Sequence, residues 1–195
     1  TLVIVTTDHA MPFPGAKASF YDSGHHCPFI LRTPDLEKRG IHHQALINWT
    51  NIRPTLHDWC GVAAPDDLPA RSFLPILGDP EVEGWDETYY SHCFHEVMDY
   101  NPYRVLRGRR YKFVRNIAAD LTPPIPGDLF RSRSWTAVRK SGIERVGRRE
   151  ISHQLKREAE ELFDLEEDPM ETTNCIGDPA LQEVAAQMRQ KLLDF

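Results

Sequence analysis

Thr1-Leu-Val-Ile-Val-Thr-Thr-Asp-His9 opens the chain and leads from an aliphatic run into an acid and an imidazole. The unbroken run Leu2 to Val5 is typical of a strand that is covered on both faces of a sheet. Open α/β sheets bind their ligands at the carboxyl ends of such strands. Asp8 offers an anionic oxygen and His9 a ring nitrogen, so the pair supplies two ligands for one divalent ion. An ordinary exit from a strand into a turn would explain Asp8 equally well.

The residues after this pair favour the binding of an oxyanion. Met11-Pro-Phe-Pro14 is stiff, because two prolines restrict its backbone, and Lys17 follows within a few residues. A metal ion and a lysine together suit a doubly charged oxyanion. Tyr21-Asp-Ser-Gly24 predicts a turn, and Pro28 to Arg32 predicts a second apolar strand.

The pattern predicts two parts, residues 1–84 and residues 85–195. In the first, Thr50 to Cys60 predicts a helix that is capped by Thr50 and has Ile52, Leu56 and Trp59 on one face. A proline-rich connector follows. In the second part, apolar residues that alternate or cluster predict an antiparallel sheet with strands at 88–92, 103–107, 110–114 and 161–165. Helical spacing predicts a closing amphipathic helix at 179–193.

The composition is that of a globular protein. The chain has 195 residues, a net charge of -6, 41% hydrophobic residues and 27% charged residues. It contains no run near the ~18 apolar residues that a membrane-spanning helix needs, so we expect no membrane span. The sequence does not indicate an oligomeric state.

Basic residues crowd the middle of this acidic chain, between Arg104 and Arg115 and again between Arg131 and Arg149. A solvated hairpin face is the simplest interpretation. Contact with a sulfated glycan is the next, and nucleic-acid binding is the least favoured of the three, so we expect no nucleic-acid partner.

The order of these motifs resembles the sulfatases of the alkaline phosphatase superfamily, and more narrowly the branch that contains the heparan N-sulfatases. The resemblance covers most of the chain and is weakest between about Arg133 and Arg157. It is carried by Asp8-His9, Pro12-Phe-Pro-Gly-x-Lys17, Tyr21-Asp-x-Gly24, Ser91-His-x-x-His-Glu96, Pro102-x-Arg104 and Glu161-Leu-Phe-Asp-Leu-x-x-Asp-Pro-x-Glu171. It implies an α/β fold, with the end of an alkaline-phosphatase-like parallel sheet followed by a small antiparallel α+β subdomain at the carboxyl terminus.

The resemblance also implies roles for individual residues. Asp8 and His9 would help to bind one calcium ion, and Lys17 would contact the sulfate group. His95 and Glu96 would lie near the sugar-binding pocket. The implied substrate is a sulfated glycan or amino sugar, and the implied location is secreted, periplasmic or lysosomal.

One part of the sulfatase pattern is missing from the chain. Sulfatases use a formylglycine made from Cys or Ser in a Cys/Ser-x-Pro-Ser-Arg-like motif, and none of Cys27, Cys60, Cys93 and Cys175 lies in such a motif. We therefore expect a carboxyl-terminal portion of a sulfatase that is inactive alone, with the nucleophile upstream. The alternatives are a non-catalytic glycan-binding module and a phosphate-ester hydrolase of the same superfamily.

Overall fold

The computed structural model describes residues 1–195 and divides them into two compact units. The first unit consists of residues 1–4 and 31–88, and the second of residues 5–30 and 89–195. Residues 5–30, which include Lys17, therefore belong to the same unit as the carboxyl-terminal sheet. The division into domains that we predicted between residues 84 and 85 stays a prediction.

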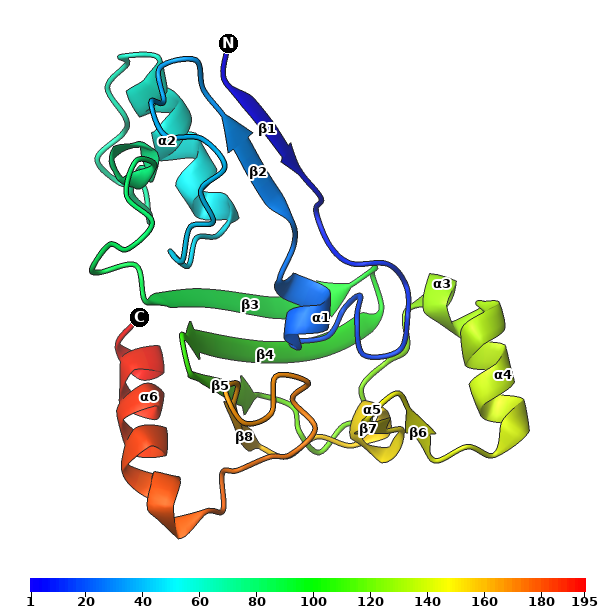
Figure 1. Cartoon of the computed structure of the whole chain (residues 1–195). Coiled ribbons are helices and arrows are strands. Elements are labelled where there is room, and N and C mark those ends of the chain that lie inside the picture. Colours follow the sequence, from blue (N-terminus) through cyan, green and yellow to red (C-terminus); the bar gives the residue numbers. More distant parts are fainter. The chain divides into compact units, whose positions relative to one another are not determined.

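Strands β1 (Val3–Thr6) and β2 (Phe29–Arg32) form a two-stranded sheet. Figure 1 draws them as arrows that point in opposite directions, so the parallel sheet that we expected is not formed by these two strands. Val3, Val5 and Ile30 are also 42%, 57% and 64% exposed. The aliphatic run predicted a buried strand, but β2 covers only its edge, and its faces are not buried within this chain.

The first unit is built around helix α2 (Ile52–Trp59), which a short 3₁₀ helix η1 (Trp49–Asn51) precedes. The capping residue is Asn48 and not Thr50, because the Asn48 side chain accepts from the Thr50 N–H while Asn51 accepts from the Asn48 N–H. A second 3₁₀ helix, η2 (Leu74–Ile76), lies within the proline-rich connector that we predicted at residues 66–80.

The buried face of α2 differs from the one that we predicted. Pro54 and Thr55 are buried, whereas Leu56 is 42% exposed. The Thr55 hydroxyl donates to the Asn51 carbonyl and accepts from the Phe73 N–H at 3.0 Å. These two hydrogen bonds turn a polar residue inward, which a count of apolar positions does not predict.

The second unit contains a four-stranded sheet in the order β3-β4-β5-β8. Its strands are β3 (Glu87–His95), β4 (Asp99–Gly108), β5 (Tyr111–Asn116) and β8 (Glu160–Asp164). The β4–β5 and β5–β8 pairs are antiparallel, as the alternating pattern predicted. All four predicted strands are present, and the β3–β4 hairpin is longer at its tip than expected.

Successive residues of β4 and β5 serve opposite faces of this sheet. Val105 pairs with Val114, and both pack on Phe20 and Tyr21. Leu106 pairs with Phe113 on the other face, which is covered by helix α6 (Gln182–Asp194) after the 3₁₀ turn η3 (Pro179–Leu181). The helical spacing of the closing segment predicts one inner side, formed by Leu181, Val184, Met188 and Leu192, and all four pack in this cluster.

Residues 127–155 form small elements that the sequence did not predict. These are α3 (Gly127–Phe130), α4 (Arg133–Ser141), β6 (Arg145–Val146), β7 (Arg149–Glu150) and α5 (Ser152–Leu155). Ser132 caps α4 by accepting from the Trp135 N–H, and Leu129, Trp135 and Val138 form a separate small core. None of the helices in the structure combines the length and the apolar character needed to cross a membrane.

Candidate functional site

Asp8 and His9 lie in the loop after β1. The His9 N–H donates to Asp8 Oδ1 at 3.0 Å, and His9 Nε2 lies 3.5 Å from Asp8 Oδ2. His9 Nδ1 lies 2.7 Å from the Ala10 carbonyl, which can only accept, so Nδ1 carries a proton. The other ring nitrogen, Nε2, therefore faces the Asp8 carboxylate.

These two side chains fit part of a metal-binding site. Calcium takes roughly six to eight oxygen ligands, whereas the pair offers one carboxylate and one imidazole. The structure groups no set of three or more His, Cys, Asp or Glu residues that could hold a metal ion. The donor set thus suits two positions of a ligand shell, and the side chain of Asp8 is 87% exposed and accessible to further ligands.

Lys17 lies at the end of a loop that is folded on the Met11 carbonyl, which accepts from the Phe13 N–H and the Lys17 N–H. Its side chain is only 15% exposed. The Lys17 ammonium donates to Asp128 Oδ2 at 2.5 Å, and Asp128 belongs to α3. The hydrogen bond from Lys17 lowers the pKa of the Asp128 carboxyl, so this carboxylate remains charged at neutral pH.

His95 and Glu96 lie at the tip of the β3–β4 hairpin. Glu96 adopts a left-handed backbone conformation, with φ of +57°. A Cβ atom at Gly127 would lie 3.5 Å from Glu96 Oε1, so the Glu96 carboxylate rests against the residue that precedes Asp128. His95 is the last residue of β3 and directly precedes Glu96, and it makes only a minor contribution to the lowered pKa of Asp128.

The structure thus brings three of the five predicted site residues to one place. Lys17 comes from the loop after β1, and His95 with Glu96 comes from the tip of the β3–β4 hairpin. Both segments reach the start of α3. No polar contact joins Asp8 or His9 to that group. The resulting site contains a cation, two carboxylates and an imidazole, which is suited to a ligand with one anionic group and several hydroxyl groups.

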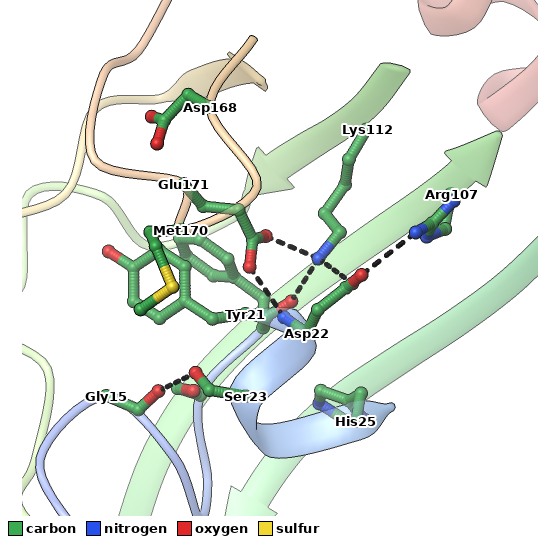
Figure 2. Close-up of polar contacts among 12 residues, drawn as sticks. Gly15, Tyr21, Asp22, Ser23, His25, Arg107, Lys112, Asp168, Met170 and Glu171 are labelled. Carbon is green, nitrogen blue, oxygen red and sulfur yellow. Dashed lines mark hydrogen bonds and ion pairs between the residues drawn. The ribbon is translucent and has the colours of Figure 1, made fainter. Parts of the chain in front are cut away.

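A buried network of charges fixes the segment that follows Lys17 (Figure 2). Lys112 of β5 is fully buried and forms ion pairs with Asp22 and with Glu171. Glu171 Oε2 in turn accepts from the Asp22 N–H at 2.7 Å, and Arg107 contacts the Asp22 carboxylate at 2.9 Å. Burial would raise the pKa of Asp22, but Lys112 and Arg107 outweigh burial and lower it to about 2.

A second anchor holds the other side of the same loop. The Ser23 hydroxyl donates to the Gly15 carbonyl at 2.5 Å, and Arg149 donates to that carbonyl at 3.1 Å. Arg149 also donates to the Met170 carbonyl, and its guanidinium lies 3.7 Å from the centre of the Tyr21 ring. The segment between Gly15 and Ser23 is therefore attached to β7 through Arg149 and to the four-stranded sheet through Asp22, and it contains Lys17.

Part of the basic stretch forms such contacts. Arg107, Lys112 and Arg149 form ion pairs inside the protein, and the half-exposed Arg110 pairs with Asp164. For Lys112 and Arg149, which are buried, a solvated face does not apply, because acidic partners distant in sequence pair with them. The charges of these two residues are balanced inside the protein.

A family model that describes the carboxyl-terminal part of N-sulphoglucosamine sulphohydrolase matches residues 16–121, which is more than half of the chain. The chain belongs to this family. Human N-sulphoglucosamine sulphohydrolase is 28% identical over 205 residues, which cover 98% of this chain and 40% of the human protein. The resemblance that we inferred from the motifs is confirmed, and the chain is a sulfatase-family domain.

Solved structures agree with this assignment at the level of the fold. A protein in complex with its substrate D-glucosamine-2-N,6-O-disulfate superposes with a TM-score of 0.70 at 19% identity, over 99% of this chain and 33% of that protein. A phosphonate monoester hydrolase of Agrobacterium radiobacter gives 0.61 at 23% identity, over 99% of this chain and 34% of that enzyme. The expected fold class is confirmed, and the chain spans 40% or less of the length of these three proteins.

Sequence reasoning missed Asp128 and Arg149. Asp128 lies in a four-residue helix with no recognisable sequence pattern, and Arg149 lies where the resemblance is weakest. Glu171 did carry a signal, because it ends the Asp168-Pro-Met-Glu171 motif, but nothing in the motif names Lys112 as its partner. The roles of Asp128, Arg149 and Lys112 became apparent only when the fold placed these residues beside the loop that carries Lys17.

Proposed function

We propose that this chain forms the carboxyl-terminal portion of a sulfatase that releases sulfate from a sulfated amino sugar or a related glycan. The convergence of Lys17, His95 and Glu96 around α3 carries this proposal. Membership of the N-sulphoglucosamine sulphohydrolase family supports the same chemistry. The sugar would lie between the hairpin tip and the loop that ends at Lys17.

Lys17 would bind an oxygen of the sulfate group. An ammonium group has three donors, and Asp128 takes one of them, so two remain for a ligand. A donor that is already in place stabilises negative charge that develops during the reaction without further reorganisation. His95 and Glu96 would hydrogen-bond to hydroxyl or amino groups of the sugar, and so determine which ring is accepted.

Asp8 and His9 would hold a calcium ion together with ligands from outside this chain. When it is bound, the ion would withdraw charge from the sulfate oxygens and so assist attack at sulfur. Asp8 would supply a carboxylate oxygen, and His9 would supply Nε2, because Nδ1 is committed to the Ala10 carbonyl.

The nucleophile would also come from outside residues 1–195, as a formylglycine. None of Cys27, Cys60, Cys93 and Cys175 lies in the required motif, which leaves this chain without an attacking group of its own. The same observation favours a second candidate, a sulfatase-derived module that binds a sulfated glycan without cleaving it. Turnover by the full-length protein separates the two candidates.

The test is sulfate release by the full-length protein from glucosamine N-sulfate and glucosamine 6-O-sulfate. Lys17→Met should lower kcat/KM by about 10²-fold or more, the loss that follows removal of one oxyanion donor. Lys140→Met, an exposed lysine on α4, is the matched control and should have no effect. His95→Ala should change the ratio between the two substrates, and unchanged turnover in Lys17→Met would overturn the proposal.

A further inference from the structure

Asp128 is the only side chain that pairs with the Lys17 ammonium, and its carboxylate is held at both oxygens. Oδ2 accepts from Lys17 at 2.5 Å, and Oδ1 accepts from the Leu129 N–H at 2.8 Å. Lys17 is 15% exposed and Asp128 is 39% exposed, so the pair lies at the edge of solvent and can meet a ligand. The two charges cancel, and Lys17 is not a free cation in this structure.

A ligand that binds Lys17 must also lie near this carboxylate. A sulfate oxygen at hydrogen-bonding distance from Lys17 Nζ would place the anion roughly 5 to 6 Å from Asp128 Oδ2, given hydrogen bonds of about 3 Å. Like charges at that separation repel measurably even when water screens them. The Glu96 carboxylate against Gly127 adds negative charge on the same side.

This repulsion acts differently on substrate and product. A sulfate ester or an N-sulfate carries one negative charge, whereas the inorganic sulfate released by hydrolysis carries two at neutral pH. Coulomb energy is proportional to the charge, so the Asp128 carboxylate opposes the product about twice as strongly as the substrate. Lys17 alone would favour the doubly charged product, and the Asp128 carboxylate reduces that preference.

We propose that Asp128 is a specificity-determining residue that weakens the hold of Lys17 on inorganic sulfate and so favours the release of product. This inference rests on the proposed role of Lys17 in binding the sulfate group. Asp128 would keep the ammonium in one position and limit its net positive charge at the same time.

The test compares inorganic sulfate with a sulfated substrate in the full-length protein that carries Asp128→Asn. Asparagine keeps an oxygen that accepts from Lys17 but removes the charge. The inhibition constant for inorganic sulfate should fall about tenfold, and the KM for glucosamine N-sulfate should fall only about threefold, the square root of that factor. Damage to the fold weakens binding, so tighter binding of sulfate separates this role from a merely structural one.

Matched variants complete the experiment. Asp120→Asn neutralises an exposed carboxylate in the same unit and should change neither constant. Asp128→Glu keeps the charge and should bind sulfate as the wild type does. If Asp128→Asn does not fold, Asp128→Ser removes the same charge and should give the same gain in affinity.

The outcomes also separate this inference from the proposed function. If Lys17→Met weakens inhibition by sulfate while Asp128→Asn leaves it unchanged or weaker, the role of Asp128 is wrong and that of Lys17 stands. If Lys17→Met changes neither inhibition by sulfate nor turnover, the proposed role of Lys17 fails, and the inference fails with it.

Discussion

Lys112→Met is the substitution that most directly tests the buried charge network behind the Lys17 loop. Lys112 is fully buried between the carboxylates of Asp22 and Glu171, and its ammonium also lies 3.3 Å from the Phe20 carbonyl. Methionine has a similar volume, so little cavity is created. The loss is electrostatic, because Glu171 is left as a buried carboxylate facing Asp22.

Breaking a buried ion pair by removing one partner costs about 3 to 5 kcal/mol. The Asp22 N–H at 2.7 Å and the more distant Arg149 still contact Glu171 Oε2, which places our expectation at about 3 kcal/mol. That is a large part of the roughly 5 to 15 kcal/mol by which a domain is stable. We therefore expect Lys112→Met to lower the free energy of unfolding by that amount.

The assay is urea unfolding of the wild type and of Lys112→Met, compared at constant m-value. Adding Glu171→Gln, which removes the stranded charge, should restore about 1 to 2 kcal/mol, since the two positions are in contact. Lys156→Met, an exposed lysine of the same unit, is the control and should stay within about 0.5 kcal/mol of the wild type. A loss below about 1 kcal/mol for Lys112→Met would refute our account of the network.

Two further predictions concern the same loop. Asp22 has its pKa lowered to about 2 from 3.8, so its stabilisation is fully present above pH 3.8 and is lost as the pH falls through 2. Asp22→Asn should cost about 2 kcal/mol in urea unfolding at pH 7 and about half as much at pH 3, and an equal loss at both pH values would contradict the assignment. Gly24→Ala would drive a Cβ atom into the Ala16 carbonyl, so we expect the free energy of unfolding to fall by about 2 kcal/mol or more and kcat/KM to fall with it. Gly40→Ala is the control, because nothing lies near the new atom. It should lose only the stability that its positive φ costs an alanine, and its kcat/KM should be unchanged. A Gly24→Ala enzyme with unchanged stability and kcat/KM would show that the close approach of Gly24 to Ala16 does not matter.

The sequence predicted the elements whose patterns are local. Val105, Leu106, Phe113 and Val114 alternate between two buried faces, and that alternation alone predicts both strands and the hairpin. The inner side of α6 follows from its helical spacing in the same way. These predictions hold because the burial of apolar side chains determines these strands and this helix, and the local order of apolar and polar residues indicates which side chains are buried.

The parts that failed depend on partners far apart in sequence. Lys112 and Glu171 are 59 positions apart, and Lys17 and Asp128 are 111 positions apart, so no window of sequence contains either pair. Thr55 faces inward because of a hydrogen bond from Phe73, which hydrophobicity cannot indicate. The resemblance to sulfatases named Lys17, His95 and Glu96, but only the fold showed that α3 brings them together.

The structure of the full-length protein with inorganic sulfate bound tests the central claim most directly. We predict a sulfate oxygen within about 3 Å of Lys17 Nζ, with Asp128 still accepting from the same ammonium. A sulfate ion bound elsewhere in the site, with Asp128 as the sole polar partner of Lys17, would contradict the account.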